Sequence, residues 1–163
     1  MSVEKISIHR TAKEAENSVI QLFALLYSGT LDKIEAKCGP ECLRAAKKAF
    51  IDSMVKANKV EFAKIEDKSI ESYLRWLLSN ITVGHEYEIV ENKENSVKFR
   101  FSSCPWAQYF RALGKEDIGF LFCAADGPLA TAFNRKIKFR RTKTLMQGDD
   151  HCNHHYYYDE KEA

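Results

Sequence analysis

The stretch IKFRRTKTLMQGDDHCNHHYYY, residues 137–158, decides the fold because it reads as two extended runs joined by a tight turn. Along residues 137–146 an extended chain places Ile137, Phe139 and Leu145 on one face and Lys138, Arg140 and Thr142 on the other, since side chains alternate at period two. Residues 147–150 are Gln-Gly-Asp-Asp, and glycine and aspartate favour turns. We therefore predict a hairpin whose returning strand carries Cys152 and His154 on one face.

A second hairpin is predicted over residues 85–103, HEYEIVENKENSVKFRFSS, where two alternating runs flank a polar centre. Its expected buried side chains are Tyr87, Ile89, Val97, Phe99 and Phe101. His85 precedes the first run and is interpreted as a surface or hydrogen-bonded residue. The two hairpins together predict a four-stranded antiparallel sheet, interrupted by helices between Pro105 and Asn134. The fold class is therefore α+β.

Three helices are predicted ahead of the sheet. The first spans residues 11–27, ends at Ser28-Gly29 and buries an apolar stripe. This stripe consists of Ala15, Val19, Leu22, Phe23 and Leu26. Gly39-Pro40-Glu41 opens the second helix, since proline is tolerated in a first turn. Ser69 begins the third, as its amino-terminal cap.

Composition limits what the chain can be. With 163 residues, 45% of them hydrophobic, and a net charge of +2, residues 1–163 suit one domain, helical over 1–83 and sheet-bearing over 84–159. The charges form no basic stripe and no apolar run spans a bilayer, so we expect neither nucleic-acid nor membrane binding. The charged start MSVEKISIHR predicts a cytoplasmic location. An exposed edge of the carboxyl-terminal hairpin could pair two chains into a homo-oligomer.

The chain has five cysteines, an odd number, and its charged start does not resemble an export signal. We therefore expect reduced thiols and no disulfide framework. Cys104 precedes Pro105 at an expected helix amino terminus, where backbone N–H groups favour thiolate. A further helix from about Glu116 would place Cys123, Asp126 and Asn134 on one stripe. Pro128 weakens this geometry, and Asp126 could instead cap a new helix. Cys123 could likewise be buried filling.

The segments CPWAQYF, residues 104–110, and AFNRKIKFRRTKTLMQGDDHCNHHYYY, residues 132–158, resemble the L-2-amino-thiazoline-4-carboxylic acid hydrolase family. The signature residues are Thr142, Thr144, Gly148, Asp149 and Cys152. The resemblance implies a hydrolase that opens a cyclic carbon–nitrogen substrate. The Gly-Asp-x-x-Cys ending is also similar to 4-vinyl reductase domains, which implies the alternative of a small-ligand-binding or zinc-containing sensor without turnover.

Two mechanisms fit the resemblance. In the first, Cys123 or Cys152 attacks as thiolate and His154 or Asp126 moves protons, without a metal. The substrate would be held by Cys104, Trp106, Asn134, Thr142 and Thr144. In the second, one zinc is bound, and its water is the nucleophile. Its ligands would come from Cys104, Cys123 and Cys152, with His154 or Asp126 as the fourth. A thiol-based redox protein is a third hypothesis.

Overall fold

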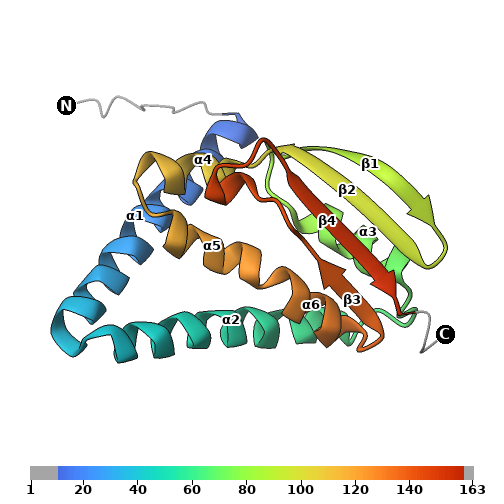
Figure 1. Ribbon diagram of the computed structural model, residues 1–163, viewed down its shortest axis with the longest axis horizontal. Helices are drawn as coiled ribbons and strands as arrows, with labels where there is room; N and C mark the ends of the chain where they lie inside the picture. Colours follow the sequence, from blue (N-terminus) through green and yellow to red (C-terminus); the bar gives the residue numbers. More distant parts are fainter. Residues whose placement is uncertain (1–10, 160–163) are drawn as a thin grey trace, which may run out of the picture.

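The computed structural model describes residues 11–159 and shows the expected α+β architecture (Figure 1). The helices are α1 (Ala12–Cys38), α2 (Pro40–Phe62), α3 (Ile70–Asn80), α4 (Pro105–Ala112), α5 (Glu116–Ala124), α6 (Asp126–Phe133) and the short 3-10 helix η1 (Leu145–Gln147). The strands are β1 (Glu86–Lys93), β2 (Ser96–Ser103), β3 (Ile137–Arg140) and β4 (Cys152–Tyr158). The amino-terminal segment on which the expected cytoplasmic location rests lies outside the described residues.

The four strands form one antiparallel sheet in the order β1-β2-β4-β3, so both predicted hairpins are present. Its inner face is covered by the carboxyl-terminal end of α2 together with α3 and α6. The apolar side chains of these helices form one core cluster with β2 and β4. A second cluster joins α1, α4, α5 and η1. No helix within residues 11–159 combines the length and apolar character needed to cross a bilayer.

Two predicted details of the sheet are wrong. The first run of the carboxyl-terminal hairpin does not extend through Met146, because β3 ends at Arg140 and η1 follows. In the first hairpin, Val97, Phe99 and Phe101 are buried as expected, but Tyr87 and Ile89 are exposed. These two residues lie on β1, which is an edge strand of the sheet, and its register shifts between Ile89 and Glu91. Their side chains are therefore only partly covered by the rest of the described chain.

The first helix is longer than predicted and buries a different face. It continues through Ser28-Gly29 to Cys38, because Leu31 extends its buried stripe, and the chain turns at Gly39 with φ of 81°. Its buried residues are Ile20, Ala24, Ser28 and Leu31. The stripe predicted to be core is exposed to solvent. Small residues on the true inner face let α1 approach α2 and α4 closely.

The packing of α5 against α4 and η1 gives a test of the fold. A Cβ atom on Gly119 would lie 2.6 Å from Met146 Sδ and 2.6 Å from Phe110 Cγ. We expect Gly119→Ala to lower the free energy of unfolding by about 1–3 kcal/mol, because the buried neighbours must shift. Urea unfolding measures this change.

Gly127→Ala is the matched control, since it also adds a methyl group to a helix. Its Cβ would meet only Phe139, at 3.5 Å, an ordinary contact. It should be neutral or stabilise by up to about 1 kcal/mol through helix propensity. Equal effects of the two substitutions would contradict the packing described.

Candidate active site

A cavity of about 400 Å³ opens between the two core clusters, bounded by α2, α3, α4, α5, α6 and the inner face of β2 and β4. Six of the residues predicted for the site line it, although they come from four separate elements. They are Cys104, Trp106, Cys123, Asp126, Cys152 and His154. The period of two along β4 brings Cys152 and His154 into the cavity together, as the sequence indicated.

The break between α5 and α6 places a thiol beside a carboxyl group. The helix predicted from Glu116 ends at Ala124, and Asp126 begins α6, with Pro128 in its first turn. Asp126 makes no capping hydrogen bond with its side chain. Its carboxylate instead forms part of the cavity wall, together with Cys123.

Arg141 completes the polar part of the wall, and its role was not predicted. Its Nη1 donates to Asp126 Oδ2 at 2.6 Å and its Nη2 donates to the Cys123 carbonyl oxygen at 3.1 Å. The guanidinium also stacks over Phe120 and Phe139, with 5.4 and 5.5 Å to the ring centroids. The side chain is only 8% exposed, so this charge is held almost entirely by the protein.

The cavity shifts its titratable groups toward their neutral forms. Burial raises the pKa of Asp126 to about 6, although the Arg141 guanidinium opposes the shift. Burial lowers the pKa of His154 to about 3, helped by the positive charge of Arg141. His154 is therefore a neutral imidazole at pH 7, while Asp126 titrates close to neutrality.

His154 is packed between aromatic rings. Its ring centroid lies 4.8 Å from that of Phe101 and 5.3 Å from that of Phe139. Its Nε2 is 3.9 Å from Asp126 Oδ2, too far for a hydrogen bond. Among the described residues, its buried Nδ1 has no hydrogen-bond partner. The imidazole is thus held by packing and retains unused hydrogen-bonding capacity.

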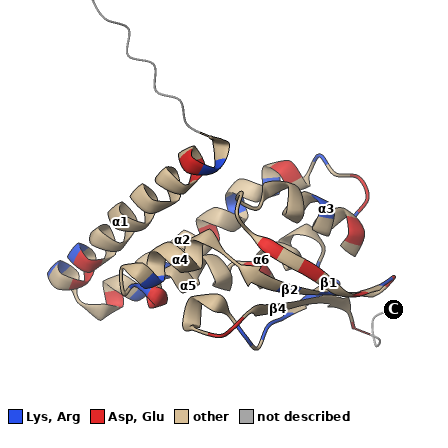
Figure 2. Ribbon diagram, turned by 90° about the horizontal axis from the view of Figure 1, so that it is seen from above, with Lys and Arg blue, Asp and Glu red and all other residues tan. Residues whose placement is uncertain are grey.

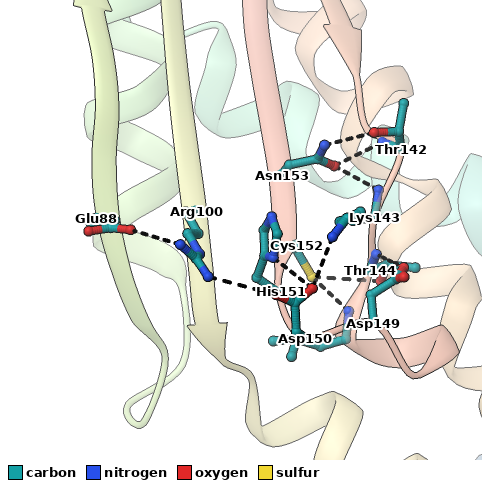
Figure 3. Close-up of polar contacts among 11 residues, drawn as sticks. Glu88, Arg100, Thr142, Lys143, Thr144, Asp149, Asp150, His151, Cys152 and Asn153 are labelled. Atoms are coloured by element: carbon teal, nitrogen blue, oxygen red, sulfur yellow. Dashed lines mark hydrogen bonds and ion pairs between the residues drawn. The ribbon is translucent and has the colours of Figure 1, made fainter.

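Thr144 lies behind the cavity wall, between the thiols of Cys123 and Cys152, and Figure 3 shows its contact with Cys152. Cys152 Sγ donates to Thr144 Oγ1 at 3.6 Å and accepts the Leu145 N–H at 3.2 Å. Cys123 Sγ is 4.0 Å from the same hydroxyl oxygen. Thr144 is only 3% exposed and does not line the cavity, so its hydroxyl positions the thiols from behind the wall.

The thiolate expected at Cys104 is not favoured. Cys104 is the residue before α4, as predicted, and the backbone N–H groups of Ala107 and Trp106 lower its pKa, but burial outweighs them and raises it to about 11. Burial, reinforced by the nearby Asp126, raises the pKa of Cys123 to about 12. Both side chains are neutral thiols at pH 7.

The donor set expected for zinc does not fit a metal in this arrangement. Cys104, Cys123, Cys152 and His154 line the same cavity, yet residues 11–159 contain no group of three His, Cys, Asp or Glu side chains that could hold an ion.

Two predicted binding residues lie elsewhere. Asn134 Nδ2 donates to the Lys68 carbonyl oxygen, and its Oδ1 accepts the Lys136 N–H, so it fastens the end of α6. Thr142 is exposed and bonded to Asn153, whose Oδ1 also accepts the N–H groups of Thr142 and Lys143 (Figure 3). The Asn153 side chain thus accepts the backbone N–H groups that a longer β3 would have paired with β4.

Two further residues of the site were missed or undervalued by sequence reasoning. Arg141 shares a strand face with Ile137 and Phe139, and a charge in register with buried side chains is the signal that could have revealed it. His85 lines the cavity and its Nδ1 lies 2.9 Å from the Thr82 carbonyl oxygen, as expected for a hydrogen-bonded residue. Nothing in its neighbouring sequence indicates the cavity.

Comparisons with known proteins place this site in context. No curated protein sequence matches the chain. Among solved structures, the Fe(II) unliganded H-NOX protein from K. algicida is similar over 84% of this chain and 96% of its own, with 11% identity and a TM-score of 0.36. A mutant of that protein matches over the same shares with 12% identity and a TM-score of 0.35. Likeness at this level carries no inference about function.

The family model described as L-2-amino-thiazoline-4-carboxylic acid hydrolase matches residues 20–156. The match includes every helix and strand that lines the cavity. It extends well beyond the two segments in which the sequence alone showed a resemblance. The chain therefore belongs to the L-2-amino-thiazoline-4-carboxylic acid hydrolase family.

Proposed function

We propose that the cavity is the active site of a hydrolase that opens a small cyclic carbon–nitrogen substrate, a thiazoline or a related amide-like ring. Family membership supports the reaction class, and a volume of about 400 Å³ suits a small molecule. The observation that carries the proposal is Asp126, a carboxyl group at the cavity wall whose pKa is raised by burial to about 6.

Asp126 acts as the general base in this proposal. A base with a pKa near the working pH is largely deprotonated there and still accepts a proton well. Arg141 occupies Oδ2, and no described residue makes a hydrogen bond to Oδ1. Oδ1 can therefore take a proton from a water molecule while the water oxygen adds to the ring carbon. Collapse of the tetrahedral adduct breaks the bond to a ring heteroatom, which receives the proton from Asp126.

The neighbouring groups assist by charge and hydrogen bonding. The Arg141 guanidinium stabilises the negative charge of Asp126 before proton transfer and the negative charge of the adduct after it. Both Arg141 and Asp126 are largely buried, which strengthens this electrostatic stabilisation. His154 is neutral, so it contributes a hydrogen bond to the substrate and no charge. Trp106 and the other apolar side chains of the wall exclude bulk solvent from the ring.

A thiolate nucleophile is less well supported. An activated cysteine needs a base within hydrogen-bonding reach or a lowered pKa. Cys123 and Cys152 both face the hydroxyl of Thr144, which is no base, and the pKa of Cys123 is raised. We therefore assign these thiols to shaping the cavity.

The largely apolar wall also favours a second candidate, a small-ligand-binding module without turnover. Trp76, Trp106, Phe101 and Phe122 surround the few polar groups, a composition typical of binding pockets. This candidate predicts that a thiazoline raises the melting temperature of the protein while the compound stays intact. Loss of the thiazoline over time, followed by NMR, supports the hydrolase instead.

Substitution of the base separates it from the thiols. With L-2-amino-thiazoline-4-carboxylic acid as substrate, Asp126→Asn should lower kcat/KM by about 10²–10⁴-fold, because a general base is lost. Cys123→Ser, which keeps the size of the side chain, should retain more than about a tenth of the activity. Circular dichroism checks that both variants fold. Abolished activity in Cys123→Ser with activity in Asp126→Asn would establish the covalent route.

The pH dependence of kcat/KM reports the same carboxyl group. The base must be deprotonated, so activity should fall as the pH drops through about 6 and level off above it. Arg141 lowers the pKa of Asp126, so Arg141→Gln should move this acidic limb to higher pH. A limb that stays in place in Arg141→Gln would mean that another group titrates.

A further inference from the structure

One face of α1 is apolar, and no other part of residues 11–159 covers it. It carries Val19, Leu22, Phe23, Leu25 and Leu26, which are 66%, 57%, 37%, 48% and 63% exposed. These five make up nearly half of the large hydrophobic side chains that are exposed within residues 11–159, and they fall within little more than two helical turns. Single exposed apolar residues are ordinary, but a contiguous patch of this kind marks an interaction surface.

The spacing along this face is that of a helix-pairing seam. Successive steps of three and four residues join Ala12, Ala15, Val19, Leu22, Leu26 and Gly29, the repeat by which two helices pack along their length. None of these residues is charged, and all are exposed. Figure 2 shows the same feature, with charged residues gathered at the two ends of α1 and its long middle section free of them.

The size of the patch suits a second protein chain. Its five large side chains expose on the order of 500 Å², at the upper end of what monomers leave in one patch. With the small residues at its ends and its polar rim, the face approaches the roughly 800 Å² that each partner buries in a standard interface. The sheet edge expected to pair two chains is a poorer surface, since β3 has only four residues.

We propose that a second copy of this chain covers the face, through antiparallel packing of the two α1 helices about a two-fold axis near Leu22 and Leu26. A seam with large residues in its centre and small ones toward its ends is self-complementary in this orientation. Val19 of one copy then meets Gly29 of the other. Parallel packing would instead place Gly29 against Gly29 and Lys33 against Lys33, which leaves a gap and opposes like charges.

The proposed dimer face is continuous with the wall of the cavity. The Phe23 ring packs edge-on against Trp106 and Phe122, with 5.9 and 5.6 Å between ring centroids, and both partners line the cavity. Burying the outer side of Phe23 in the dimer would fix the aromatic side of the cavity from behind. The proposal itself does not depend on which reaction the cavity performs.

Sedimentation velocity of the full chain tests the proposal. At about 100 μM the wild-type protein should sediment with twice the 18.8 kDa mass of one chain, and dilution should shift the equilibrium to monomer. Leu22→Glu with Leu26→Glu should raise the dissociation constant at least about 100-fold, because two charges enter the buried centre. Glutamate and leucine have similar helix propensities, so α1 should remain helical.

Val60→Glu is the matched control, since Val60 is 63% exposed near the carboxyl-terminal end of α2, the end that lies far from α1 in Figure 1. It should leave the dissociation constant unchanged. A wild-type protein that is monomeric at about 100 μM, where a standard interface would be populated, would overturn the proposal. So would a dimer that survives the double substitution on α1, because its interface would then lie elsewhere.

Discussion

The ion pair between Arg141 and Asp126 is the interaction on which the rest of the site depends. Burying either charge alone would cost several kcal/mol, so each residue must be placed where the other can reach it. Arg141 turns inward and binds both Asp126 and the Cys123 carbonyl oxygen, which ties the end of β3 to the break between α5 and α6. The regular strand ends at Arg140, one residue before this side chain.

The path of the chain beyond Arg141 follows from that turn. Beyond Arg140 the regular ladder stops. The side chain of Asn153 accepts the N–H groups of Thr142 and Lys143, and the Asn153 N–H still donates to the Lys143 carbonyl oxygen at 3.3 Å. The segment then reaches Thr144, which begins η1 and lies between the thiols of Cys123 and Cys152. The Arg141–Asp126 pair thus lies where the regular strand stops, and the segment that follows carries the hydroxyl group behind the cavity.

Local signals in the sequence were sufficient for the frame but not for the site. The alternation along β4, the Ser69 cap and the Gly39-Pro40 helix start each depend on neighbouring residues, and all three were predicted. Arg141 was missed because its partner is fifteen residues away on another element, and strand periodicity carries no information about such a pair. The neutral state of Cys104 was missed for a related reason. A helix amino terminus favours thiolate locally, whereas the burial that outweighs it comes from the whole fold.

The misassigned face of α1 has a physical explanation of its own. The helix carries two apolar stripes, and periodicity alone cannot say which one is buried within the chain. The stripe with Ala24 and Ser28 packs on α2 and α4 because small side chains permit close approach, which leaves the bulkier stripe around Leu22 outside. Large apolar residues spaced for helix pairing are costly to expose to water. In the proposed dimer that stripe is buried after all, between two chains, and it supports Phe23 where this side chain backs the aromatic wall of the cavity.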